Sequence, residues 1–384
     1  MNRREFMQFS ALTTLTSAGL FPTLSLADTV NNKRRIVVLV ELEGGNDGLN
    51  TLVPYTDPIY QDKKIRRNLT LSKSQVIDVG SNMGMHSSLK PLKGLWDKDQ
   101  LAWVQNVGFA QPDGSHFRSR DIWETAGTFN HIPDEGWLAQ VLPQRSYGVD
   151  GIVVGQGLGP MSGKRCRSVV MQDPKTFVQQ AESLDDLDLE CSNPSLQHIV
   201  DVQKQLHGAK DVLERSARMR HIDRYFPVRR TFNNDLRSVA KMIVGGADAS
   251  VYKVSLGGFD THASQAVPHK NLLHYLAQGL DSFSKAMISS HMWDNVVVMT
   301  YSEFGRRIKQ NLSGGTDHGI AAPMLVMGGK VKGGVLYGHN PDLKNHDNWN
   351  VRHEFDIRSV YGTITENWWG YENPWANQGK IDFV

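Results

Sequence analysis

Two neighbouring segments near residue 310 carry side chains suited to metal chemistry. A β-rich run, residues 296–299, leads into residues 300–307, so Glu303 should emerge at the carboxyl end of a buried strand. Residues 315–319 follow and contain Asp317 and His318. Carboxylate oxygens and imidazole nitrogens are common ligands of divalent cations. We therefore expect half of a metal site here; pairing of Glu303 with a nearby arginine is the structural alternative.

Two further acidic clusters follow predicted strands. Asp47 lies in a glycine-rich turn after the apolar run 35–42, where a carboxylate is placed to bind metal, although Asx-Gly is also a common turn. Asp260 and His262 follow the run 251–256 and two glycines. Carboxylate and imidazole two residues apart can face one cavity from an irregular loop. Both clusters are candidate ligands of the same site.

Ser115 precedes a predicted helix over residues 116–125. Its hydroxyl is placed as an N-cap, which alone explains a serine there. If the hydroxyl also touched a metal, it could instead ionise and attack a phosphorus or sulfur centre. His116, Arg118 and Arg120 follow on the same helix and could ligate metal or hold anionic oxygens.

Strand patterns alternate with helical patterns along the chain. Strands are predicted at 35–42, 101–107, 152–154, 251–256, 295–301 and 324–327, and helices at 116–125, 196–220, 235–244 and 270–288. This alternation predicts an α/β fold, a mostly parallel central sheet with helices on both faces. The clusters meet only if the sheet order places their loops at one edge.

The first 27 residues resemble a twin-arginine signal peptide, with Arg3 and Arg4, a weakly apolar run and small residues at 25–27. A single domain is then expected over residues 28–384, with a charged, strand-poor helical insertion at about 164–232. We therefore expect a periplasmic or secreted protein whose partners include the twin-arginine translocation machinery.

Composition narrows the function classes. The formal net charge is +2, and lysine and arginine are dispersed, so we expect no nucleic-acid partner. No stretch of the mature chain approaches a membrane span, which predicts no stable span in the mature form. Cys166 and Cys191 are the two cysteines; whether they pair as a disulfide stays open.

Six ordered motifs resemble an exported bacterial family known as domain of unknown function 1501, which is similar to the alkaline phosphatase-like superfamily of phosphatases and sulfatases. The motifs are GGNDG at 44–48, SHF at 115–117, GFDTH at 258–262, SEFGR at 302–306, GTDHG at 315–319 and FDIRSVY at 355–361. The resemblance implies an alkaline phosphatase-like fold and a two-metal hydrolase in which Ser115 matches the nucleophile. Asp47, Asp260, His262, Glu303 and His318 would match metal ligands, with His116 or Asp317 rebuilding a position.

Two neighbouring residues depart from the superfamily pattern. Phe304 occupies a position where an imidazole ligand is expected, and Glu303 is one methylene longer than the usual aspartate. One metal position is therefore altered or lost.

The leading hypothesis is a metal-dependent hydrolase that acts on a small or polymeric anionic substrate, a phosphate or sulfate ester. The histidines suggest zinc, and the carboxylates suggest manganese, magnesium or calcium. Ser115 or a water would be the nucleophile, and Arg118 or Arg306 would offset developing charge. The alternatives are a non-catalytic secreted module that binds an anionic polymer or an envelope partner, and a transferase that moves phosphoryl-linked groups onto an envelope glycan.

Overall fold

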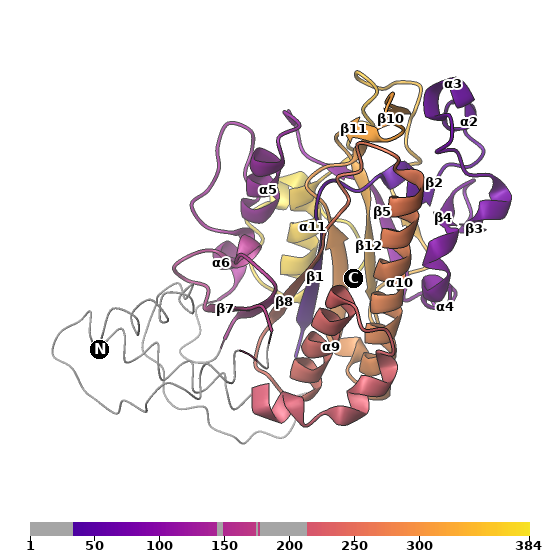
Figure 1. Cartoon of the computed structure of the whole chain (residues 1–384). Coiled ribbons are helices and arrows are strands. Elements are labelled where there is room, and N and C mark those ends of the chain that lie inside the picture. The colour runs from indigo at the N-terminus through magenta and orange to yellow at the C-terminus, as the bar shows by residue number, and fades with distance from the viewer. Residues whose placement is uncertain (1–33, 144–148, 174–175, 177–212) are drawn as a thin grey trace, which may run out of the picture.

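The computed structural model describes residues 34–143, 149–173, 176 and 213–384. Its centre is a nine-stranded sheet with the order β13-β5-β12-β9-β1-β8-β6-β7, and β14 pairs with β5 (Figure 1). The strands are β1 (Ile36–Leu42), β5 (Leu101–Gly108), β6 (Gly151–Val154), β7 (Ser168–Met171), β8 (Val251–Leu256), β9 (Val296–Tyr301), β12 (Ala322–Gly328), β13 (Leu336–Tyr337) and β14 (Phe355–Asp356).

Two small sheets flank the large one. The first has the order β2-β4-β3 and contains β2 (Leu52–Val53), β3 (Val76–Asp78) and β4 (Gly84–His86). The second pairs β10 (Arg306–Gln310) with β11 (Thr316–His318). The helices of the described residues are α2 (Pro58–Gln61), α3 (Lys63–Arg66), α4 (Lys93–Trp96), α5 (His116–Thr125), α6 (Trp137–Val141), α9 (Thr231–Val244), α10 (Ala266–Ser289) and α11 (Ile357–Thr363).

Alternation along β1 explains why helices cover both faces of the sheet. Ile36 and Val38 point to one face, where they join a core with buried residues of α9 and α10 such as Phe283. Val37 and Leu39 point to the other face, against residues of α5, α6 and α11. Because successive strand residues alternate between faces, an all-apolar strand needs a helix layer on each side. Figure 1 shows α9 and α10 in front of the sheet and α11 behind it.

The predicted fold class is confirmed. Strands β9, β1, β8, β6 and β7 run parallel, and β12 runs antiparallel to both β9 and β5. The predicted strands agree with the observed ones to within two residues at each end, and the helices at 116–125 and 270–288 are present as α5 and α10.

The direction of β12 positions the site. The carboxyl ends of β1, β8, β9 and β5 open at one edge of the sheet, where ligands bind in open α/β folds. Because β12 is antiparallel, its amino end lies at this same edge, directly after β11. All the predicted clusters therefore share one edge.

Residues predicted as the insertion at 164–232 include a strand. Strand β7, at 168–171, forms the edge of the main sheet beside β6, so the sheet continues past residue 164. It was missed because its four residues are too few for a clear periodic signal.

Several predictions fall on residues that the structure does not describe. These are most of the predicted helix at 196–220, the signal at 1–27 and Cys191. Cys166 is buried as a free thiol. Among the described helices, none combines the length and apolarity of a membrane span.

Candidate metal centre

Three side chains meet in a tight triangle above the carboxyl edge of the sheet. His262 Nε2 lies 2.8 Å from His318 Nε2, and Asp260 Oδ1 lies 3.0 Å from the first nitrogen and 3.2 Å from the second. Asp260 and His262 leave the end of β8, and His318 ends β11. The predicted convergence of these loops is therefore observed.

The ring of His318 is oriented by the loop that precedes α5. Its Nδ1 lies 2.7 Å from the carbonyl oxygen of Gly114, which can only accept, so Nδ1 carries the proton. Burial lowers the pKa of His318, and the Gly114 carbonyl opposes this only in part. The ring is thus neutral at neutral pH. Its Nε2 presents a lone pair to the triangle.

His262 has a supporting carboxylate behind it. Its Nδ1 lies 3.6 Å from Asp317 Oδ1, and Asn311 donates to both that oxygen and the His262 carbonyl. The Asn311 hydrogen bond, with help from Arg307 and His262, lowers the pKa of Asp317, so this carboxylate is ionised. A carboxylate behind a histidine fixes the tautomer that offers Nε2 to a metal.

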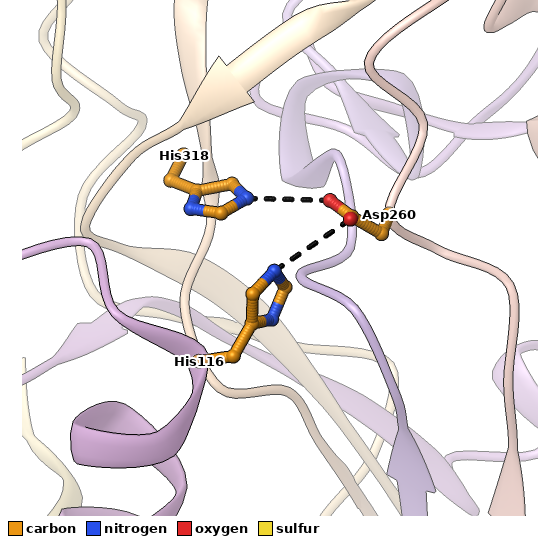
Figure 2. Close-up of side chains that lie close together, drawn as sticks. All are labelled: His116, Asp260 and His318. Atoms are coloured by element: carbon orange, nitrogen blue, oxygen red, sulfur yellow. Dashed lines mark hydrogen bonds and ion pairs between the residues drawn. The ribbon is translucent and has the colours of Figure 1, made fainter.

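Asp260 is shared between two sides of the site. Its Oδ1 accepts from Arg306 Nη2 at 2.5 Å, and its Oδ2 lies 3.6 Å from His116 Nε2 (Figure 2). Burial raises the pKa of Asp260, but Arg306 and His318 outweigh it, and the net pKa is lowered. The side chain remains 46% exposed, so its carboxylate is open to an incoming ion.

His116, on the first turn of α5, bridges this group to Glu303. Its Nδ1 lies 3.5 Å from Glu303 Oε1, while its Nε2 faces Asp260. Donor atoms of His116, Asp260 and His318 all lie within 4.8 Å of one another. Figure 2 shows the side chains of His116 and His318 both directed toward Asp260. Residues from three separate loops thus offer nitrogen and oxygen to one small volume.

The triangle fits a divalent cation. Metal–nitrogen and metal–oxygen bonds of 2.0–2.2 Å place neighbouring ligands roughly 3 Å apart, which matches its 2.8–3.2 Å edges. With His318 and His262 held through Nδ1, two nitrogen lone pairs and a carboxylate oxygen face each other. Arg306 supplies a positive charge on the buried side of this set, with Nη2 2.5 Å from Asp260 Oδ1 and Nη1 3.5 Å from His262 Nε2. The half-exposed side of Asp260, toward His116, is the side left for an ion. Two imidazoles and a carboxylate are a common donor set for zinc.

Phe304 forms an apolar wall beside the histidines. Its ring centroid lies 4.3 Å from that of His318 and 5.0 Å from that of His116. It is 1% exposed. The residue therefore packs where the sequence pattern led us to expect a ligand, and it shields the histidines on one side.

Asp47 is not brought into the cluster. Its side chain is fully buried and accepts from Arg66 at 2.7 Å, from the Gln265 amide and from the backbone nitrogens of Leu49 and Asn50. Both oxygens are occupied by these donors. Burial raises the pKa of Asp47, but Arg66 and His269 outweigh it and the pKa is lowered. The carboxylate anchors the turn after β1 instead of facing the site.

Arg306 lies beneath the site and does not face a substrate. It is 1% exposed and donates to the carbonyls of Gly44, Gly45, Thr316 and Phe259 as well as to Asp260. A guanidinium with this many internal acceptors has no donor left for a developing charge. Its role is to hold the loops after β1 and β8 together and to fix Asp260.

Ser115 has the expected capping geometry. Its Oγ accepts from Arg118 N at 3.4 Å, at the long end for a hydrogen bond, and it is partly exposed. Its neighbours on both sides, Gly114 and His116, contact the cluster. Arg118 lies with its guanidinium 5.7 Å from the Phe129 ring. Ser115 therefore lies at the border of the site as a cap and a candidate nucleophile.

Three supporting residues escaped sequence reasoning. Arg66 occurs in the basic run 63–67, a pattern typical of a solvent-exposed helix face. In the structure its side chain is fully buried. Asn311 and the Gly114 carbonyl act through loop geometry, which composition does not reveal. Gly114, which follows Asp113, was the one sequence signal that the loop before α5 passes close to another segment, here the one that carries His318.

Comparison with protein families agrees with the motifs. Residues 178–367 match the family model described as "Protein of unknown function (DUF1501)". This part of the chain is similar to that family. The matched range contains Asp260, His262, Glu303 and His318, and Ser115 and Asp47 precede it. No curated protein matches the chain in sequence.

Several solved structures are distantly similar to the chain. The periplasmic domain of EptC from Escherichia coli, in complex with Zn, has a TM-score of 0.45 at 12% identity, covering 92% of this chain and 87% of its own. The lipoteichoic acid synthase LtaP from Listeria monocytogenes has a TM-score of 0.39 at 10% identity, covering 89% and 73%. A protein of the alkaline phosphatase superfamily from Vibrio parahaemolyticus has a TM-score of 0.38 at 11% identity, covering 97% and 76%.

Proposed function

We propose that the chain is a metal-dependent hydrolase of a phosphate or sulfate ester. The observation that carries this proposal is the triangle of His262 Nε2, His318 Nε2 and Asp260 Oδ1, with edges of 2.8–3.2 Å. His116 completes the donor set from the opposite side of Asp260. A bound divalent cation would polarise the ester oxygens and lower the pKa of a coordinated hydroxyl or water.

The residues around the triangle supply binding and attack. The amino end of α5 presents its first-turn N–H groups, which favour an anionic ester. Ser115, at this end, or a water attacks the phosphorus or sulfur centre, the ester bond breaks, and the departing oxygen takes a proton. Phe304 and the buried Arg306 keep bulk water from the underside of the site. The donor set favours zinc, with manganese, magnesium and calcium as the further candidates.

The first experiment measures metal content and hydrolysis together. Purified chain reconstituted with zinc or manganese is assayed on generic aryl phosphate and aryl sulfate esters. His318→Ala is expected to lose bound metal and activity, and Ser115→Ala to keep metal while losing ~10²-fold or more in rate if its oxygen attacks. The exposed His274→Ala and Ser74→Ala are the matched controls. Unchanged activity in both site variants would reject the proposal.

A binding module of the same fold is the second candidate. It is favoured by Phe304, which packs on two histidines where a ligand was expected, and by the Ser115 Oγ that already serves as a cap. Such a protein would bind an anionic polymer or an envelope partner without turnover. Metal loading with no hydrolysis of either ester class, together with retention on an anionic resin that depends on His318, would support it.

Export is a proposal that rests on residues 1–27 alone. It places the protein in the periplasm or outside the cell, with the twin-arginine machinery as its partner. Cell fractionation of the full chain tests it directly. Replacing Arg3 and Arg4 by lysine should retain the uncleaved chain in the cytoplasm.

A further inference from the structure

The carboxylates around the site fall into two kinds. Asp260 and Asp317 have side chains 46% and 48% exposed and both contact His262. Asp47 and Glu303 are buried, with side chains 0% and 2% exposed. A buried carboxylate needs a counter-charge, and which cation supplies it decides whether a metal is required there.

Glu303 already has its counter-charge in Arg120. Its Oε1 accepts from Arg120 Nη2 at 2.9 Å, and its Oε2 accepts from the Gly44 backbone nitrogen at 2.6 Å. Arg120 comes from α5, one helical turn after His116. Both oxygens of the carboxylate are therefore occupied by donors of the chain itself.

Arg120 has two further acidic neighbours, Glu41 and Glu124, but its one close side-chain hydrogen bond goes to Glu303. Glu41 lies 3.6 Å from Arg120 Nε but is paired at 2.7 Å with Lys253, and both members of that pair have side chains 3% exposed. Burial raises the pKa of Glu124 to about 7, so this carboxyl carries only part of a negative charge. The buried pair Glu41–Lys253 is neutral by itself. Arg120 therefore balances Glu303, as Arg66 balances Asp47.

We propose that the site takes one divalent cation, at the triangle, and that Arg120 stands in the place of a second cation beside Glu303. This inference rests on the proposed function and specifies its metal stoichiometry. A second cation beside Glu303 would meet the Arg120 guanidinium on Oε1 and the Gly44 N–H on Oε2 of a side chain that is 2% exposed, and like charges in such a buried place repel strongly. Asp260 also bonds an arginine, but only through Oδ1, and its side chain is 46% exposed. Without the Arg120 charge, Glu303 and His116 Nδ1, 3.5 Å apart, can ligate a second ion; the ring proton of His116 then lies on Nε2, toward Asp260 Oδ2, and the first ion is held by the triangle alone.

Metal counting on the full chain tests this without reliance on turnover. Apo protein is titrated with Mn²⁺, and bound metal is measured by elemental analysis together with the electron paramagnetic resonance spectrum. The wild type is expected to bind one ion per chain with the spectrum of an isolated ion. Arg120→Met is expected to bind two ions with a spin-coupled spectrum, and the further change Glu303→Gln should return the count to one.

Two control variants separate the charge from the shape of the side chain. Arg120→Lys keeps a cation and should bind one ion. Arg118→Met alters an arginine of the same helix that packs over Phe129, and it should also bind one.

The outcomes distinguish this inference from the proposed function. Two ions in the wild type, or one ion in folded Arg120→Met, would overturn the role of Arg120 while leaving a metal centre in place. No ion in the wild type would overturn the metal centre itself.

Discussion

At the scale of single residues, the counter-charge decides what each carboxylate does. Asp47 and Asp260 both follow a parallel strand and a glycine, and the sequence alone treats them alike. In the folded chain Asp47 is enclosed by Arg66 and Gln265, whereas Asp260 keeps one oxygen toward His116. The difference comes from α3, whose basic residues gave no sequence signal of burial.

The buried pair of Asp47 and Arg66 gives the first prediction. Asp47→Asn leaves the Arg66 guanidinium without a charged partner in the core, and we expect unfolding free energy to fall by about 3–5 kcal/mol. The double variant with Arg66→Met should recover part of that loss. Chemical denaturation measures both. Metal binding should persist in the double variant; its loss there, with the fold intact, would make Asp47 a ligand after all.

Asp317 gives the second prediction, as a residue that acts through His262. Asp317→Asn removes the charge that holds His262 Nδ1 and should weaken metal affinity by roughly 10–100-fold. Calorimetric titration with zinc measures the change. The control is Asp97→Asn, which loses only an exposed pair with Lys93 and should leave affinity unaltered.

At the scale of elements, most of the site's scaffold was predictable. Continuous apolar runs identified β1, β5, β8 and β9. The rule that parallel strands end at one edge also explains why Asp260 and Glu303 lie on either side of His116. The direction of β12 was not predictable, because an apolar run carries no record of its orientation. That direction is what brings His318 to the edge. The ion pair between Arg120 and Glu303 could not be predicted from the sequence either, because its two residues lie 183 positions apart.

The hairpin of β10 and β11 gives the third prediction. A Cβ on Gly315 would lie 2.2 Å from the backbone carbon of His262, so Gly315→Ala must push the hairpin away from the loop after β8. We expect a loss of about 1–3 kcal/mol in stability and a weaker metal site. Gly94→Ala, in a helix with open space around it, is the control and should be neutral or stabilising. Full metal affinity in Gly315→Ala would contradict the contact.

At the scale of the whole molecule, a charged layer is buried between the sheet and α5. Glu41, Lys253, Arg120 and Glu124 lie in or beside it, under the site. Burial, followed by the repulsion of Glu41, raises the pKa of Glu124 to about 7, and Lys253 opposes the shift. The stability of the fold should therefore depend on pH.

Glu124 gives the fourth prediction. Its folded pKa of about 7 exceeds the ordinary 4.5, so the folded chain binds this proton more tightly than the unfolded chain. The contribution of protonated Glu124 to the free energy of unfolding is fully present below pH 4.5. It is lost as the pH rises through the folded pKa of about 7. Glu124→Gln should raise Tm at pH 8.5 by on the order of 2 °C and change it less at pH 5. Thermal unfolding followed by circular dichroism measures this, and the exposed Glu372→Gln should show no such difference.

The antiparallel β12 has one more consequence, for the order of events in biogenesis. The Gly114 carbonyl, Asp260 and His318 come from stretches of the chain that leave the ribosome at different times, and His318 reaches the site only when β12 has inserted between β5 and β9. An ion held by Asp260 and by His318, whose ring the Gly114 carbonyl orients, would therefore bind only after all three segments have been synthesised and folded. Metal binding would then stabilise only the fully synthesised and folded chain, because a ligand that binds the native state alone shifts the folding equilibrium toward it.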